Sequence, residues 1–268
     1  FIGTNAWDYA DANGKLVNQE IIKKLKEADN GIWVEYISKN SLKKAYAKKV
    51  EDSQGNEYFI ACGYYPEISR DNVFNLVRRG YQYVKTSGKS ATARDFSNPQ
   101  NNEYRDGDLY LTMYNIEGKV IADGDNRELI GKNYIDEKDE NGKLYVRELI
   151  EKAQSGGGWV NAKLNNSFKS FYVEKIDIGT ENLVITSGLY PVSKKETVEI
   201  LAKSAADHLK SNTLEVAFHD FTALDGKFVR GDLQVFALDA SGICYAYGDD
   251  YDLIWKNLMR VQDDNKKL

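Results

Sequence analysis

The spacing of hydrophobic positions changes along the middle of the chain. Apolar residues recur every three or four positions from 73 to 84, which predicts a long amphipathic helix beginning after Ser69. From 109 to 114, aliphatic and sulfur-containing side chains alternate with tyrosine and threonine, as in a strand. A turn at Gly118 then leads to an apolar run at 120–122, so these two segments are expected to form a β-hairpin.

The residues that follow predict a second helix and three more strands. Apolar positions at 149, 150 and 153 suit a short helix that ends at the three glycines 156–158. Strands are expected at 159–160, 171–176 and 183–189. The order helix, two strands, helix, three strands predicts an α+β fold. Its five-stranded antiparallel sheet would have helices to one side and a concave face that can enclose a small ligand.

Much of this pattern is repeated along the chain at a nearly constant offset, and such self-similarity indicates a repeated structural module. The first set of matches pairs Asp11 with Asp139, Gly31 with Gly157, Trp33 with Trp159, Lys43 with Lys169, Tyr46 with Tyr172, Gly63 with Gly188 and Pro66 with Pro191. The second set pairs Asp95 with Asp220, Gly107 with Gly231, Asp108 with Asp232 and Gly118 with Gly242. The two sets together predict three consecutive modules, of which two are incomplete.

The expected boundaries are a C-terminal half module at 1–66, a complete module at 67–191 and an N-terminal half module at 192–268. A half module would expose a sheet edge and half of a core, which favours aggregation. Residues 1–66 are therefore expected to pair with residues 194–268 and complete a second domain. The pairing would occur within one chain or by exchange between the two chains of a homodimer. The outer halves depart from the repeated pattern at Thr4, Cys62, Trp255 and Lys266, and if ligand binding or turn geometry depends on these positions, the outer halves are structural only.

Charge and hydropathy exclude some partners. The net charge is −5, and lysine and arginine are spread among aspartate and glutamate. A nucleic-acid surface needs a concentrated basic patch, so no nucleic-acid partner is expected. The densest basic run, at 43–49, is interpreted as a solvated strand edge. No apolar run approaches the roughly 20 residues that span a bilayer, and residues 1–6 do not resemble a signal peptide. A membrane anchor is therefore expected outside the 268 residues.

Residues with catalytic or metal-binding chemistry are few. The two histidines, His208 and His219, leave no Ser-His-Asp site in the middle module and argue against a histidine-rich metal site. We interpret His208 as a surface residue of a helix. The acidic loop 136–142 has Lys138 where a calcium loop needs an oxygen ligand, so Asp139 is expected to organise a turn. No catalytic residue, metal or other cofactor is expected.

The two cysteines, Cys62 and Cys244, allow a disulfide but do not require one, because a chain of this size can bury a core without disulfides. The favoured interpretation is two small buried residues in strands.

Taken in order, several short motifs resemble the Cache family, specifically its PAS-like type 2 extracellular sensor domains. The motifs are Gly107-Asp108-Leu109-Tyr110, Gly131-Lys132-Asn133, Gly158-Trp159-Val160, Lys169 with Tyr172-Val173, and Ser187-Gly188-Leu189-Tyr190. The resemblance implies a non-catalytic, extracytoplasmic sensor of a small organic acid or similar metabolite in a histidine kinase or chemoreceptor. The alternative that stays open is a stand-alone periplasmic ligand-binding or scaffolding protein built from Cache repeats.

Seven residues are the candidates for contacts with the ligand. Aromatic walls bury the apolar part of a ligand, and hydroxyl or ammonium groups fix its polar end. Lys169 would neutralise a carboxylate through a charge-assisted hydrogen bond. The first choices are Trp159, Lys169, Tyr172 and Tyr190, and the secondary choices are Tyr110, Tyr114 and Asp123. The competing interpretation is that the aromatic residues are core and that Lys169 is exposed.

Overall fold

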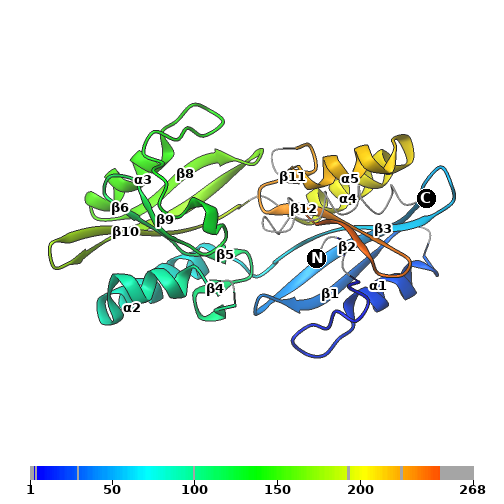
Figure 1. Ribbon diagram of the computed structural model, residues 1–268, viewed down its shortest axis with the longest axis horizontal. Helices are drawn as coiled ribbons and strands as arrows, with labels where there is room; N and C mark the ends of the chain where they lie inside the picture. Colours follow the sequence, from blue (N-terminus) through cyan, green and yellow to red (C-terminus); the bar gives the residue numbers. More distant parts are fainter. Residues whose placement is uncertain are drawn as a thin grey trace. The chain divides into compact units, whose positions relative to one another are not determined.

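The computed structural model describes residues 3, 5–28, 30–98, 100–191, 194–223 and 226–247. The chain divides into two compact units. Among the described residues, unit 1 combines 5–38 and 42–66 with 194–247, so it joins segments from the two halves of the chain (Figure 1). Unit 2 consists of residues 39–41 and 67–192. Positions 248–268 of the expected C-terminal half module lie outside the described residues.

Unit 2 is a five-stranded antiparallel sheet between helices. The strands follow the order β7-β6-β10-β9-β8. Its elements are α2 (Arg70–Phe96), η1 (Asn102–Tyr104), β4 (Arg105–Asp106), β5 (Leu109–Tyr110), β6 (Thr112–Asn115), β7 (Val120–Asp123), η2 (Arg127–Leu129), α3 (Tyr145–Gln154), β8 (Gly158–Leu164), β9 (Ser167–Ile178) and β10 (Glu181–Leu189). The predicted α+β class, hairpin and five-stranded sheet are confirmed.

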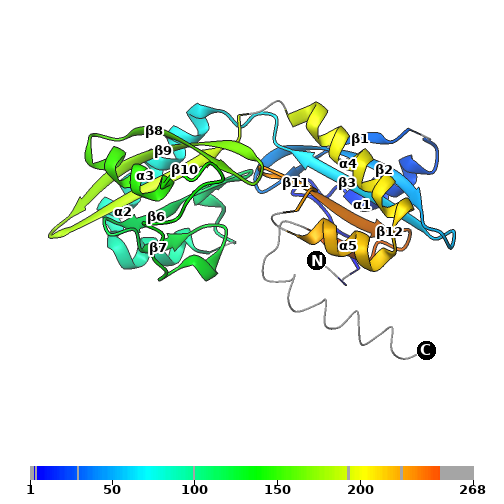
Figure 2. The same cartoon turned by 90° about the horizontal axis from the view of Figure 1, so that it is seen from above.

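The two main helices of unit 2 cover opposite faces of the sheet, so the expectation of helices to one side is wrong (Figures 1 and 2). The physical reason lies in the strands. Successive side chains of a strand point to opposite faces of the sheet, and here both faces carry apolar side chains. Within β9, Ile176 packs with α2 residues such as Leu76, whereas Val173 packs with α3 residues such as Leu149. Each face therefore needs its own helix to bury it.

Local signals explain where α2 begins and bends. Ser69 accepts a hydrogen bond from the backbone N–H of Asn72, and the Asn72 side chain accepts one from the backbone N–H of Ser69, which forms a capping box. Gly88, with φ of 76°, interrupts the helical conformation within the element. The predicted helix after Ser69 is confirmed.

Unit 1 has the same strand order, although its parts come from the two ends of the chain. Its sheet follows the order β1-β2-β3-β12, with β13 and β11 both pairing with β12. Its elements are α1 (Val17–Leu25), β1 (Ile32–Ser38), β2 (Ser41–Glu51), β3 (Glu57–Tyr64), α4 (Lys194–Ser211), α5 (Leu214–Thr222), β11 (Val229–Arg230), β12 (Leu233–Asp239) and β13 (Cys244–Tyr247). Strands β12 and β13 therefore take the places that β6 and β7 have in unit 2.

The two ends of the chain meet where β3 pairs with β12, and we call this pairing the seam. The strands are antiparallel, with Cys62 opposite Val235 and Ile60 opposite Ala237. Helices α4 and α5 pack on one face of this sheet, and α1 packs on the other. A core that contains Ile60 and Val235 together with Leu201 of α4 closes across the seam.

A repeated aspartate organises the turn that precedes α3 in unit 2 and α1 in unit 1 and ties this turn to the neighbouring strand. Asp139 accepts hydrogen bonds from the backbone N–H groups of Asn141, Lys143 and Lys163, at 2.9, 2.9 and 2.8 Å. Asp11 accepts from Asn13, Lys15 and Ile37, at 2.8, 2.9 and 3.0 Å. The turn role expected for Asp139 is confirmed.

Two other interpretations of single residues are corrected by the structure. His208 is not a surface side chain: its ring packs against Phe221 and Phe228, and its Nε2 lies 2.9 Å from a carboxylate oxygen of Asp220. The basic run 43–49 is not a strand edge, because β2 lies between β1 and β3. Helix packing and strand order, which depend on distant segments, decide both outcomes.

The expectation of two buried cysteines is confirmed. Cys62 and Cys244 are free thiols in the core of unit 1. Burial raises the pKa of each thiol to about 12. In the described part of the chain, no helix is both long and apolar enough to cross a bilayer.

Candidate ligand-binding site

The Lys169 ammonium group is held among three aromatic rings on the α3 face of unit 2. Only 8% of Lys169 is exposed, so the interpretation of an exposed lysine is wrong. Its Nζ lies 4.9 Å from the ring centre of Tyr110, 5.2 Å from that of Tyr190 and 5.3 Å from that of Phe171. It also donates a hydrogen bond of 3.2 Å to the Tyr110 hydroxyl. Aromatic faces attract a cation, and here they hold the positive charge in one place.

The local sequence explains how Lys169 reaches this position. Asn165 and Asn166 both adopt positive φ, at 51° and 58°, and form the tight turn that joins β8 to β9. The register of the hairpin places Lys169 opposite Ala162. A Cβ atom at Gly188 would lie 2.7 Å from the Phe171 ring and 3.2 Å from Lys169 Cε. Glycine at 188 therefore leaves room for the lysine stem.

Asp123 lies on the same face and organises the turn after β7. It accepts hydrogen bonds from the Thr112 hydroxyl at 2.8 Å and from the backbone N–H groups of Asp125 and Asn126 at 3.0 and 2.7 Å. Burial raises the pKa of its carboxyl, and the bonds from Asn126 and Thr112 oppose that rise. These contacts give Asp123 a structural role in unit 2.

Tyr114 lies on this face too, within the apolar cluster beneath α3. It is 8% exposed and packs in a cluster with Val146 and Leu149 of that helix. Burial raises the pKa of its hydroxyl well above the usual value. Its surroundings are those of a core residue.

Trp159 and Tyr172 lie on the opposite face of the sheet, against α2. They are directly paired across β8 and β9, with ring centres 5.4 Å apart. Arg70 lies over the Trp159 ring at 4.5 Å, and Phe74 meets the Tyr172 ring at 5.1 Å. The Tyr172 hydroxyl donates to Glu174. The structure thus brings Lys169, Tyr110 and Tyr190 together but separates them from Trp159 and Tyr172.

Phe171 is the aromatic neighbour of Lys169 that the candidate set does not contain. It follows Lys169 by two positions in β9, so both side chains lie on the same face of the sheet. Two-residue spacing from the lysine is the sequence signal that identifies it.

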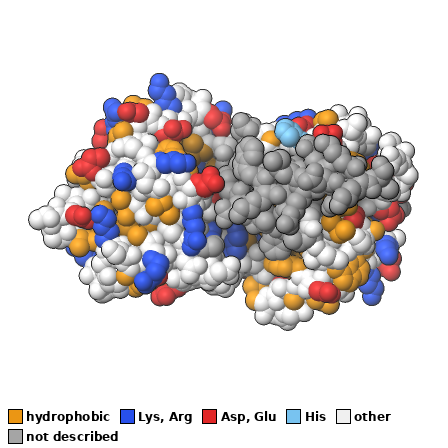
Figure 3. Space-filling view, viewed as in Figure 1, with side chains coloured by type: hydrophobic (Ala, Val, Ile, Leu, Met, Phe, Trp, Pro, Cys, Tyr) orange, Lys and Arg blue, Asp and Glu red, His pale blue; other side chains and the backbone are white. Residues whose placement is uncertain are grey.

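Charges elsewhere on the surface are mixed in sign. On the face shown in Figure 3, lysine and arginine side chains are interspersed with aspartate and glutamate over unit 2. Among the described residues, no group of three or more histidine, cysteine, aspartate or glutamate side chains is placed to hold a metal ion.

Comparison with known proteins finds a family match for the middle of the chain. The family model described as Single Cache domain 2 matches residues 71–191. No curated protein sequence matches the chain. Solved structures similar to this chain include a methyl-accepting chemotaxis protein from Vibrio parahaemolyticus, at 21% identity and TM-score 0.36, covering 45% of this chain and 87% of that one. A structure described for carboxylic acid recognition by a Cache chemosensory domain has 17% identity and TM-score 0.37, covering 46% of this chain and 92% of that one.

Proposed function

We propose, from the match of residues 71–191 to the family model Single Cache domain 2, that the chain is the extracytoplasmic, ligand-binding part of a bacterial signalling receptor. The receptor class we propose is a histidine kinase or a chemoreceptor. The chain itself binds and does not catalyse. Its ligand is a small carboxylate or a similar metabolite, bound on the α3 face of unit 2.

The observation that carries this proposal is the buried Lys169 ammonium among three aromatic rings. A carboxylate at this position would receive a charge-assisted hydrogen bond from Lys169 and a second bond from the Tyr110 hydroxyl. The rings of Tyr190 and Phe171 would bury its apolar carbons. Because the charge is fixed in advance by its surroundings, little side-chain entropy is lost on binding.

Helix α2 is the element through which binding would be transmitted. It packs directly on the sheet, where its residues Leu76 and Val84 share a cluster with Ile176 of β9 and Ile185 of β10. Lys169 lies on β9, on the other side of the same sheet. A ligand that prefers one arrangement of these strands would shift the population of helix positions by its difference in affinity.

Replacing Lys169 with methionine tests the site. We expect Lys169→Met to weaken binding of small carboxylates by about 10- to 100-fold, because one charge-assisted hydrogen bond is lost. Isothermal titration calorimetry of the full chain with acetate, propionate and pyruvate measures the change.

The matched control is Lys175→Met in the same strand. Lys175 is half-buried and pairs with Asp177 away from the three rings, so its removal should leave affinity unchanged. Equal affinity of wild type and Lys169→Met for the carboxylate that binds would contradict the proposed role. Equal loss in both lysine variants would contradict it as well, since the effect would then follow net charge.

A further inference from the structure

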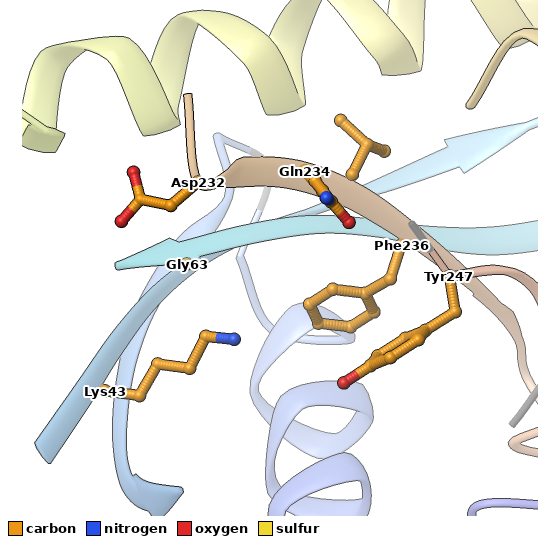
Figure 4. A pocket seen from close by; sticks show the side chains of 7 residues that line it. Lys43, Gly63, Asp232, Gln234, Phe236 and Tyr247 are labelled. Carbon is orange, nitrogen blue, oxygen red and sulfur yellow. The ribbon is translucent and has the colours of Figure 1, made fainter. Parts of the chain in front are cut away.

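Unit 1 contains a hollow between strands that come from the N-terminal and the C-terminal segments of the chain. Its cavity volume is about 30 Å³, which is room for roughly two or three water molecules. The lining residues are Lys43, Gly63, Asp232, Gln234, Val235, Phe236 and Tyr247. Figure 4 shows Lys43 extending from β2 toward the rings of Phe236 and Tyr247 on β12 and β13. One wall therefore belongs to residues 41–64 and the other to residues 232–247.

The hollow keeps two features of the Lys169 site. By the sequence repeat, Lys43 corresponds to Lys169 and Gly63 to Gly188. A Cβ atom at Gly63 would lie 3.0 Å from Lys43 Cε, so this glycine also makes room for a lysine stem. Lys43 Nζ lies 5.3 Å from the ring centre of Tyr65. Each unit therefore places one lysine ammonium beside an aromatic ring on the same face of its sheet.

The opposite wall has different chemistry in the two units. Strand order places Gln234 where unit 2 has Tyr110, and Phe236 where it has Thr112. Thr112 of unit 2 hydrogen-bonds to Asp123, whereas the Phe236 ring lies tilted beside the Tyr247 ring, with ring centres 6.4 Å apart. A hydrogen-bonded polar pair is thus replaced by an aromatic pair. The side chains beside the lysine therefore differ in chemistry between the two units.

Two of the residues that line the hollow carry a buried acceptor atom. Gln234 Oε1 and Asp232 Oδ1 are buried without a hydrogen-bond partner among the described residues. The second carboxylate oxygen of Asp232 pairs with Lys194. Gln234 lines the hollow from β12, and Asp232 lies directly before this strand. Buried acceptors without partners are rare because they lose their hydration, so a bound N–H donor would satisfy them.

We propose that this hollow is a second ligand site, for a small zwitterion with an ammonium group and a carboxylate. The ammonium donates to Gln234 Oε1, and the carboxylate accepts from Lys43. The rings of Phe236 and Tyr247 cover the short carbon chain, and the small, partly open hollow admits part of a ligand such as glycine or alanine. Because each end of the chain supplies one wall, binding also stabilises the seam. The proposal does not depend on ligand binding at Lys169.

Calorimetric titration of the full chain with glycine, L-alanine, acetate and methylammonium tests the proposal. We expect glycine or L-alanine to bind the wild type and Lys169→Met equally. Lys43→Met and Gln234→Leu should each weaken that binding by about tenfold or more, because each removes a hydrogen bond to a charged group. Gln234→Glu keeps an acceptor at this position, so it should retain binding. Hydrogen exchange of residues 32–64 equal to that of the wild type would show that Gln234→Leu is folded and that its loss of binding is not misfolding.

Four results would overturn the proposal. The first is no binding of glycine or L-alanine by the wild type. The second is loss of that binding in Lys169→Met, which would move the ligand to unit 2. The third is binding unchanged in Lys43→Met and Gln234→Leu. The fourth is equal affinity of glycine and acetate in the Lys169→Met chain, where acetate binding in unit 2 is weakened, since Gln234 Oε1 would then contribute nothing. If only the proposal for Lys169 fails, carboxylate binding is unchanged in Lys169→Met. The expected results for glycine and L-alanine in unit 1 then stay the same.

Discussion

A chain carrying Val235→Asp is expected to lose the fold of unit 1 while unit 2 stays folded. Val235 is fully buried, pairs with Cys62 across the seam, and packs in the core beneath α4. An aspartate there would place a carboxylate without partners in an apolar core, at a cost of roughly 4 kcal/mol or more. Hydrogen exchange read by mass spectrometry should show loss of protection at 32–64 and 233–247, with 158–189 still protected.

The matching variant in unit 2 is Leu111→Asp. Leu111 is fully buried in the cluster beneath α2, and it corresponds to Val235 in the repeat. This variant should remove protection from 158–189 and preserve it in 32–64. Arg230→Asp, at an exposed position of β11, is the surface control and should leave both units protected. Simultaneous loss of both units in either core variant would show that the two cores are not separate folding units.

The second large effect is expected at the repeated aspartate. Asp139→Ala should lower the free energy of unfolding of unit 2 by about 2–4 kcal/mol, because three backbone N–H groups lose a charged acceptor. Urea unfolding followed by hydrogen exchange of residues 158–189 measures the loss in unit 2. Glu137→Ala, at an exposed position two residues earlier, is the control and should change stability little.

The same aspartate gives a pH dependence with a definite sign. Burial alone would raise the pKa of Asp139, but the bonds from Lys163, Lys143 and Asn141 outweigh it, and the pKa lies below the ordinary 3.8. Its stabilising effect is therefore complete above the unfolded pKa and is lost as the pH falls through the folded one. The stability difference between wild type and Asp139→Ala should be constant near neutral pH and shrink below about pH 4. A difference that grows on acidification would contradict this reasoning.

The sequence predicts the fold of unit 2 well because its signals are local. Ser69 and the apolar spacing after it define the start of α2, and alternation around Leu111 defines the hairpin. The repeat also identifies which segments of the two ends correspond to one another. That β3 pairs with β12 depends on contacts between residues about 175 positions apart, such as Cys62 and Val235, which no local pattern can show.

The sequence predicts the surroundings of Lys169 less completely, because the candidate residues of one strand lie on two faces of the sheet. The strand expected at 171–176 begins at Ser167 in the structure, so Lys169 lies within it. Lys169 and Tyr172 are three positions apart, and an odd separation along a strand puts two side chains on opposite faces. With the longer strand, this rule would have separated Tyr172 from the lysine and added Phe171 to its surroundings.

His208 shows a different limit. The position of His208 on an amphipathic helix does not predict that its side chain is covered. The rings that cover it, Phe221 and Phe228, come from the next helix and the segment after it. Only the folding of α5 back onto α4 brings them there. Tertiary packing of this kind is not recorded in the spacing of one helix.

The most direct test of the account is a cross-link between the two ends of the chain at the seam. Val235→Cys would place a thiol opposite Cys62, within the Cα separation that a disulfide requires, and Cys244→Ser removes the other thiol. Because burial raises the pKa of Cys62, the bond should be formed during refolding in a glutathione redox buffer. Peptide mapping by mass spectrometry should find a linked Cys62 peptide in a monomeric chain. Linked dimers, or no link at all, would contradict a unit closed within one chain.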